Sequence, residues 1–258
     1  MSEKIILGSN GIKRVLRKFS PVEAIAEYIW NGYDADATKI DVQIDANAIE
    51  GINKITIIDN GCGIDFRSLD KKFKPFYESN KMLYKNENNN SSLIHGKNGI
   101  GRLTFFTFAR VAKWTTVYND DNRTFKYTIE IAENGLDDYA ASEPKELQDG
   151  STGTVVEFDD INEEVLVSEI IEFVKTDFAW FIELNQKRNI QLLFNGKKLD
   201  YSNLLKDKEY KQYRYEGYEF DIVFCRWEKK LHQEYSKYYY LNSKGMEVYK
   251  ENTSLQLF

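Results

Sequence analysis

The sequence predicts an α/β fold, because stretches with helical periodicity alternate with stretches that have the two-residue period of strands. Apolar residues recur three and four positions apart after Ser20 and again from Val165 to Ile182, which predicts two amphipathic helices. Runs of alternating apolar residues between and after these helices predict strands. Of the 258 residues, 42% are hydrophobic and 14% aromatic, which is enough for a full core and excludes a disordered chain.

The first helix has the clearest boundaries. Ser20 and Glu23 have the spacing of a capping box, and Pro21 suits the first helical position. The helix should end near residues 34–36, where the apolar periodicity stops. Its apolar stripe consists of Val22, Ile25, Ala26 and Ile29.

The remaining elements follow from short local patterns. Residues 102–109 are expected to be helical. A hairpin is expected at residues 190–200, because Asn195-Gly196 suits the type I′ turn between two adjacent strands. Strands are expected at residues 40–44, 54–58, 112–118, 123–131, 153–158, 218–224 and 238–241.

An aromatic run between residues 210 and 240 has two interpretations. Aromatic side chains interleaved with lysine and arginine can stack on the bases of single-stranded nucleic acid. The alternation of apolar residues from Tyr218 to Phe224 is instead typical of a strand with one buried face. Acidic residues in the same run would repel phosphate, so the sequence favours the buried face.

Net charge and cysteine content exclude several classes of function. The net charge of −6 gives no whole-molecule attraction to nucleic acid. Cys62 and Cys225 are the only cysteines, and neither has the spacing of a zinc site. No apolar run approaches the roughly 18 residues of a membrane helix, and the first residues lack a signal-peptide pattern. We therefore expect a cytoplasmic protein with no membrane partner.

The first helix carries two candidate functional residues. Glu27 and Asn31 lie one turn apart, on the side opposite to the apolar stripe. A carboxylate in that position can accept a proton from an attacking water, and an amide oxygen can bind magnesium. The alternative is an ordinary polar stripe on a solvated helix face.

A second candidate is the turn after the strand at residues 54–58. Asp59 at the strand end could accept a hydrogen bond from an exocyclic amine such as that of adenine, and Gly61 and Gly63 would let the backbone approach a flat ring. The alternative is a tight turn between strands with no ligand. A further and weaker motif is Gly153-Thr154 at the start of a later strand, where Thr154 could hydrogen-bond near a base. The alternative is that this pair only begins the strand, as Gly-Thr commonly does.

A long polar loop and a glycine-rich turn form the third candidate. Residues 66–98 have little to bury, and loops of this length are often lids or binding elements. The turn from Gly96 to Gly101 precedes a predicted helix, where exposed amides bind phosphate. It is not a P-loop, because no Gly-x-x-x-x-Gly-Lys-Ser/Thr occurs. It is not a dinucleotide fingerprint either, because Thr104 stands where the third glycine would fall.

Taken together and in this order, the four motifs resemble the GHKL superfamily, whose members share the Bergerat ATP-binding fold. The matching residues span roughly positions 15–160. The continuation from Asp34 to Thr38 is most similar to the MutL and MORC proteins, with the ninety-kilodalton heat-shock chaperones close behind. The resemblance implies a two-layer sandwich with a mixed, mainly antiparallel sheet and helices on one face, followed by a smaller α/β segment.

The resemblance also implies roles for individual residues. Glu27 is expected to be the catalytic general base, Asn31 the protein ligand to Mg²⁺, and Asp59 the residue that recognises adenine. Histidine kinases usually have asparagine where this chain has Glu27, so this residue favours hydrolysis. The other residues expected to bind ATP are Gly61, Gly63 and Thr154 around the base, and Gly96, Lys97, Gly99, Gly101 and Arg102 around the phosphates.

We therefore expect magnesium-dependent ATP binding and slow hydrolysis, with lid closure and nucleotide-dependent homodimerisation. Residues 1–160 should be the ATP-binding domain, with its lid at about 66–98. Residues 161–258 should be a truncated transducer-like segment of a longer protein, whose missing C-terminal region would bind a protein client or nucleic acid. The alternatives are a nucleotide-gated binding module without useful hydrolysis, and an interaction domain that binds no nucleotide.

Overall fold

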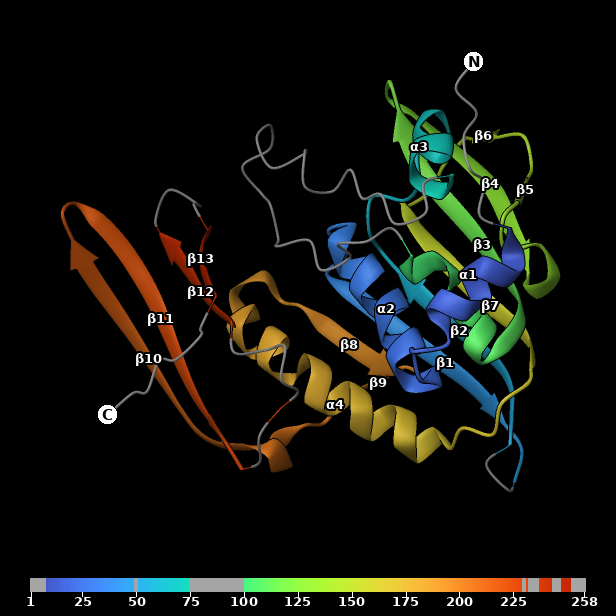
Figure 1. Ribbon diagram of the computed structural model, residues 1–258. Helices are drawn as coiled ribbons and strands as arrows, with labels where there is room; N and C mark the ends of the chain where they lie inside the picture. Colours follow the sequence, from blue (N-terminus) through green and yellow to red (C-terminus); the bar gives the residue numbers. More distant parts are fainter. Residues whose placement is uncertain are drawn as a thin grey trace, which may run out of the picture.

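The computed structural model describes residues 8–48, 51–74, 100–228, 231, 237–242 and 247–251, and these form two sheets with helices (Figure 1). The α-helices are α1 (Ser9–Leu16), α2 (Pro21–Asp34), α3 (Leu69–Phe73) and α4 (Val167–Leu184). Short 3₁₀ helices are η1 (Phe66–Ser68), η3 (Gly101–Thr107), η4 (Glu133–Gly135), η5 (Gln186–Arg188) and η6 (Ser202–Leu204).

The larger sheet is mixed and mainly antiparallel. Its strand order is β5-β4-β3-β7-β2-β1-β8-β9, with β6 paired to β4. Among its described strands, only β1 and β8 pair in parallel. The strands are β1 (Lys39–Ala46), β2 (Ile52–Asp59), β3 (Ala109–Asp120), β4 (Arg123–Ala132), β5 (Ala140–Ala141), β6 (Lys145–Leu147), β7 (Gly153–Ile161), β8 (Gln191–Phe194) and β9 (Lys197–Lys198).

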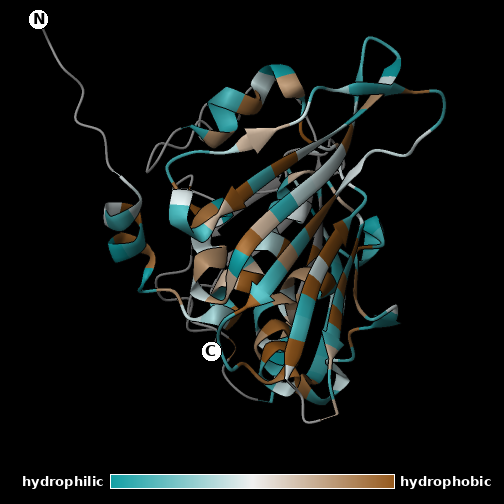
Figure 2. Cartoon of the chain, turned by 90° about the vertical axis from the view of Figure 1, so that its right-hand side faces the viewer, coloured by the Kyte–Doolittle hydropathy of each residue, from teal (hydrophilic) through white to brown (hydrophobic). Residues whose placement is uncertain are grey.

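Helices cover one face of this sheet, which confirms the predicted two-layer fold class. Figure 2 shows the strands in front, with hydrophilic and hydrophobic residues alternating along them, and the helices behind. Tyr28 of α2 packs edge-on against Phe158 of β7, with ring centroids 4.7 Å apart. Trp30 stacks on Phe178 of α4 at 4.3 Å, so α2 contacts both the sheet and α4. No helix among the described residues is long and apolar enough to span a membrane.

The start of α2 has the predicted cap. The hydroxyl of Ser20 accepts a hydrogen bond from the Glu23 backbone N–H, and the Glu23 carboxylate accepts one from the Ser20 N–H at 2.8 Å. Pro21 occupies the first helical position. These bonds satisfy N–H groups that have no partner within the helix, so the sequence fixes the helix start and the face on which Glu27 and Asn31 lie.

Residues 102–109, predicted as helical, form the tighter 3₁₀ helix η3 at Gly101–Thr107, and β3 begins at Ala109. Hydrogen bonds from threonine side chains accompany this tighter 3₁₀ geometry. The Thr104 hydroxyl donates to the Gly101 carbonyl at 2.7 Å, and the Thr107 hydroxyl donates to the Thr104 carbonyl at 2.9 Å. Both bonds span three residues, which matches the period of a 3₁₀ helix.

The smaller sheet has the strand order β10-β11-β12-β13. Its strands are β10 (Leu205–Tyr215), β11 (Tyr218–Trp227), β12 (Lys237–Asn242) and β13 (Glu247–Glu251). The prediction of one buried aromatic face is wrong at Phe224, whose side chain is 41% exposed. Tyr213 and Tyr215, which the register places on the same face, are also exposed, since no described layer covers that side of the hairpin.

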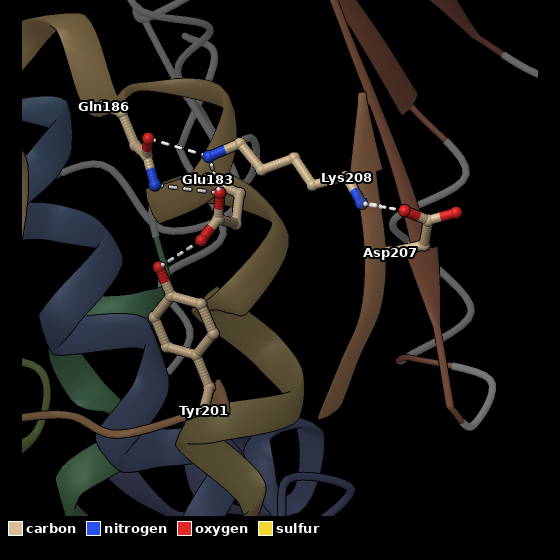
Figure 3. Close-up of polar contacts among 5 residues, drawn as sticks. All are labelled: Glu183, Gln186, Tyr201, Asp207 and Lys208. Carbon is tan, nitrogen blue, oxygen red and sulfur yellow. Dashed lines mark hydrogen bonds and ion pairs between the residues drawn. The ribbon is translucent and has the colours of Figure 1, made fainter. Parts of the chain in front are cut away.

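The predicted domain boundary at residue 160 falls at the last residues of β7, and the larger sheet continues past it through β8 and β9. A polar cluster around the buried Glu183 then joins α4 to the smaller sheet (Figure 3). The carboxylate of Glu183 accepts hydrogen bonds from Lys208 Nζ of β10 at 2.5 Å and from the Tyr201 hydroxyl at 2.9 Å. Gln186 Nε2 donates to the same carboxylate at 2.9 Å.

Candidate active site

The start of η3 lies directly against the functional face of α2. A Cβ atom placed on Gly101 would lie 2.7 Å from Glu27 Oε2 and 3.7 Å from Asn31 Nδ2. A side chain at this position would therefore require the Glu27 carboxylate to move. The structure brings Gly101 together with Glu27 and Asn31, as the sequence predicts for a phosphate-binding turn beside a general base and a metal ligand.

Asp59 is the last residue of β2, the strand that lies between β1 and β7. Its Oδ1 accepts two hydrogen bonds, from the Gly61 backbone N–H at 2.8 Å and from the Thr154 backbone N–H at 3.2 Å. Within the described residues, Oδ2 accepts none. One oxygen of the carboxylate thus fixes its orientation, and the other is available to a hydrogen-bond donor on a ligand.

The protonation equilibrium of Asp59 is shifted by its surroundings. Burial raises the pKa of Asp59 from its ordinary 3.8 to about 6, because the ionised form loses hydration. The N–H groups of Gly61 and Thr154 act in the opposite direction, since they stabilise the carboxylate. A carboxyl group whose pKa lies this close to neutral pH is typical of a functional site.

The two glycines after Asp59 are required by close backbone contacts. Gly63 has φ +73°, and a Cβ atom there would lie 2.1 Å from the Val117 carbonyl oxygen. A Cβ atom on Gly61 would lie 2.5 Å from the Ala35 carbonyl oxygen. The turn 59–63, which we call the base loop, therefore lies pressed between the end of α2 and strand β3.

Thr116 of β3, which was not predicted from the sequence, organises this region. Its hydroxyl is fully buried, accepts a hydrogen bond from the Ile64 N–H at 2.9 Å, and lies 3.2 Å from the Thr154 hydroxyl. Ala112, Trp114 and Tyr118 share its buried register on β3. A polar residue within that apolar alternation was the available signal, because buried hydroxyls need partners.

Gly32, also missed, lets α2 approach the sheet at the site. A Cβ atom there would lie 2.7 Å from Ile40 Cδ1 and 3.1 Å from Asp59 Cβ. The residue that follows Asn31 on α2 thus packs beside Asp59, so one helix contacts both Asp59 and Gly101. The signal was a glycine inside a helical pattern, which often has a packing reason.

Arg102, expected at the phosphates, is directed toward the end of α3. Its Nη2 donates to the Phe73 carbonyl oxygen at 2.6 Å, and its guanidinium carbon lies 5.7 Å from the Phe73 ring centroid. Burial lowers the pKa of Arg102 to about 10. The Arg102 carbonyl accepts a hydrogen bond from the buried Tyr28 hydroxyl at 2.7 Å, which fastens η3 to α2. A phosphate contact by Arg102 stays a prediction.

Part of the predicted site lies outside the described residues. This holds for Gly96, Lys97 and Gly99, and for most of the expected lid, of which the structure describes residues 66–74. Among the described residues, no group of three or more histidine, cysteine, aspartate or glutamate side chains is arranged to hold a metal ion. Asn31, the Mg²⁺ ligand expected from the sequence, lies on α2, and its role as a metal ligand stays a prediction.

The sequence of residues 19–163 matches a family described as histidine kinase-, DNA gyrase B-, and HSP90-like ATPases. The chain belongs to this family. The match covers the helix with Glu27 and Asn31, the base loop and β7, and it confirms the GHKL resemblance found from the motifs. The family is one of ATP-binding ATPase domains. No curated protein sequence gives a significant match to the chain.

The solved structures similar to this chain include the ATPase region of Saccharomyces cerevisiae topoisomerase II. The two are 17% identical in sequence, with a TM-score of 0.49. The alignment covers 78% of this chain and 57% of the topoisomerase chain, so this chain spans little more than half of that structure's length.

Proposed function

We propose that this ATPase-family chain binds ATP together with Mg²⁺ and hydrolyses it slowly. The observation that carries the proposal is the arrangement around α2. Gly101 lies against Glu27 and Asn31 of α2. Gly32, which follows Asn31 on the same helix, packs beside Asp59. Neighbouring positions of one helix therefore contact both Asp59, which would recognise the base, and Gly101, which would lie at the phosphates.

The described residues fit the adenine end of ATP. Asp59 Oδ2 is available to accept a hydrogen bond from the exocyclic amine, while Oδ1 is held by Gly61 and Thr154. The base loop offers backbone without side chains at Gly61 and Gly63, as a flat ring requires. Thr154, fixed by its contact with Thr116, completes this end of the site.

The described residues also fit the phosphate end. Asn31 would supply an amide oxygen to Mg²⁺, a hard cation that takes few protein ligands and keeps waters and phosphate oxygens. When bound, the ion supplies charge neutralisation at the phosphates. Glu27 would accept the proton of the attacking water, one turn away on the same helix. Gly101 would lie at the phosphates, and the family resemblance adds Gly96, Lys97 and Gly99, which lie outside the described residues.

Further parts of the proposal come from the family resemblance. Segment 66–98 would close over the nucleotide, and closure would drive a conformational change or homodimerisation in a longer protein. A relationship to the MutL, MORC or heat-shock branch, a client or nucleic-acid partner, and a cytoplasmic location stay predictions from the sequence.

Calorimetric titration with a non-hydrolysable ATP analogue and magnesium tests the proposal. Saturable binding by the wild type that is lost in Asp59→Asn supports it. Absence of binding to the well-folded wild type contradicts it. A second candidate function, a nucleotide-gated module without hydrolysis, predicts binding with no phosphate release, whereas the ATPase predicts release that depends on Glu27.

A further inference from the structure

Asn60 connects the base loop to the loop that follows α2. Its Oδ1 accepts hydrogen bonds from the backbone N–H groups of Thr38 at 2.9 Å and Lys39 at 2.8 Å. Its Nδ2 donates to the Thr38 hydroxyl at 3.0 Å. The side chain thus makes three hydrogen bonds to two adjacent residues although it lies at the surface, which restricts a group that would otherwise be mobile in water.

Backbone contacts join the same two loops. The Cys62 N–H donates to the Ala35 carbonyl oxygen at 2.8 Å, and the Asn60 N–H donates to the Lys39 carbonyl oxygen at 3.3 Å. Ala35 and Lys39 lie at the two ends of the loop that joins α2 to β1. Asn60 is therefore the side-chain component of a contact that sets the base loop against the helix with the phosphate-binding residues.

We propose that Asn60 is a positioning residue for adenine recognition. It holds the base loop in the conformation in which Asp59 and the glycine backbone face the base, and it does so from outside, through the loop at Thr38. This inference rests on the proposed function, because positioning matters only if the loop binds adenine. It adds a role for the residue between Asp59 and Gly61 that the motif itself leaves open.

Asn60→Ala should weaken binding of the ATP analogue about tenfold, because two or three modest hydrogen bonds that order the loop are lost. Affinity for inorganic tripolyphosphate should be unchanged, since that probe engages only the phosphate end. Thr38→Val removes the hydroxyl partner and leaves both N–H bonds to Oδ1, so its effect should be smaller, about threefold. In steady-state turnover, Asn60→Ala should raise KM and leave kcat unchanged.

Asn53→Ala is the matched control, an exposed asparagine on β2, the strand that precedes Asn60, and away from the site. Its analogue affinity should equal that of the wild type. The melting temperature without ligand gives a second measurement, and Asn60→Ala should melt within about two degrees of the control. A positioning role requires the loss of analogue affinity without a comparable loss of stability.

Three outcomes would overturn the inference. They are unchanged analogue affinity in Asn60→Ala, an equal loss for tripolyphosphate, or a fall in melting temperature large enough to explain the weaker binding. These results differ from failure of the proposed function itself, in which the folded wild type would not bind the analogue.

Discussion

The Thr154 backbone N–H donates to Asp59 Oδ1 at 3.2 Å, which joins two residues that lie 95 positions apart in the chain. The register of β2 against β7 pairs the same two residues. Asp59 is therefore oriented by the sheet itself and by its own turn. The carboxylate is set in place before any ligand binds, and this preorganisation favours tight and selective recognition.

Asp59→Asn should retain the fold and lose roughly a hundredfold or more in affinity for the ATP analogue. The amide oxygen can replace Oδ1 as acceptor for Gly61 and Thr154, which leaves Nδ2, a donor, where Oδ2 now lies. A donor facing the exocyclic amine cannot form the bond and leaves both groups unsatisfied. Calorimetry measures the loss, and Asp45→Asn, an exposed position on β1, is the control.

Stability should depend on pH through Asp59. Its pKa of about 6 in the folded state lies above the ordinary 3.8, so the folded protein binds this proton more tightly than the unfolded chain. The resulting stabilisation is present below about pH 4 and is lost as the pH rises through 6. It amounts to at most about 3 kcal/mol.

Urea denaturation at pH 4.5 and 7.5 checks this prediction in the wild type and in Asp59→Asn. The variant cannot ionise at this position, so its stability relative to the wild type should rise between the two pH values. A constant difference would show that Asp59 titrates alike in the folded and unfolded states and would contradict the shift.

Glu27→Gln should lower turnover by roughly 10²–10⁴-fold and leave the affinity for the ATP analogue nearly unchanged. Glutamine has nearly the same shape beside Gly101 but cannot accept a proton from water. Phosphate release under saturating ATP measures the effect, and Glu130→Gln, exposed on β4, is the control. Equal turnover in the variant and the wild type would remove Glu27 from the catalytic step.

The sequence predicted the local part of this site and could not predict the rest. Glu27 and Asn31 share a face because the helical period is set by neighbouring residues, and the cap at Ser20 fixed the register. The contact of Asp59 with Thr154 depends on β7 lying beside β2, and strand order is a property of the whole sheet. No local pattern encodes that order.

The hairpin of β10 and β11, which is rich in aromatic residues, shows the same limit of local sequence patterns. Alternation correctly placed a strand at residues 218–224, since it reports which side chains share a face. Whether another layer covers that face depends on distant segments, and Phe224 is exposed. Burial was therefore predicted well where helices pack on the larger sheet and wrongly on the smaller one.

Gly63→Ala should destabilise the protein by more than about 2 kcal/mol and abolish analogue binding. Gly63 has φ +73°, which costs an L-residue energy, and the new Cβ would meet the Val117 backbone oxygen at 2.1 Å. Backbone cannot move aside as the end of a side chain can. Thermal and urea denaturation measure the change.

Gly135→Ala is the control for this substitution. A Cβ atom on Gly135 would meet no atom within 4 Å, so its stability should stay within about 0.5 kcal/mol of the wild type. Similar stability of the two alanine variants would mean that the base loop is free to shift, contrary to the contacts seen.

Lys208→Met should loosen the smaller sheet from α4. The Glu183 side chain is only 6% exposed, and its pairing with Lys208 Nζ at 2.5 Å is the ion pair that links α4 to β10. Without the lysine, a buried carboxylate keeps only its bonds from Tyr201 and Gln186, which should cost about 2–3 kcal/mol. Hydrogen exchange should therefore accelerate in β10 and β11 more than in β2 and β7.

Two further variants separate the charge pair from lost packing. In Glu183→Gln combined with Lys208→Met, the amide still accepts from the Tyr201 hydroxyl and no charge is left buried, so much of the stability should return. Lys206→Met removes an exposed lysine of the same strand, 3.8 Å from Glu228, and should change stability by less than about 0.5 kcal/mol. If the double variant is no more stable than Lys208→Met, the lysine does not stabilise the protein by compensating a buried charge. The packing of the lysine side chain then holds β10 to α4 instead.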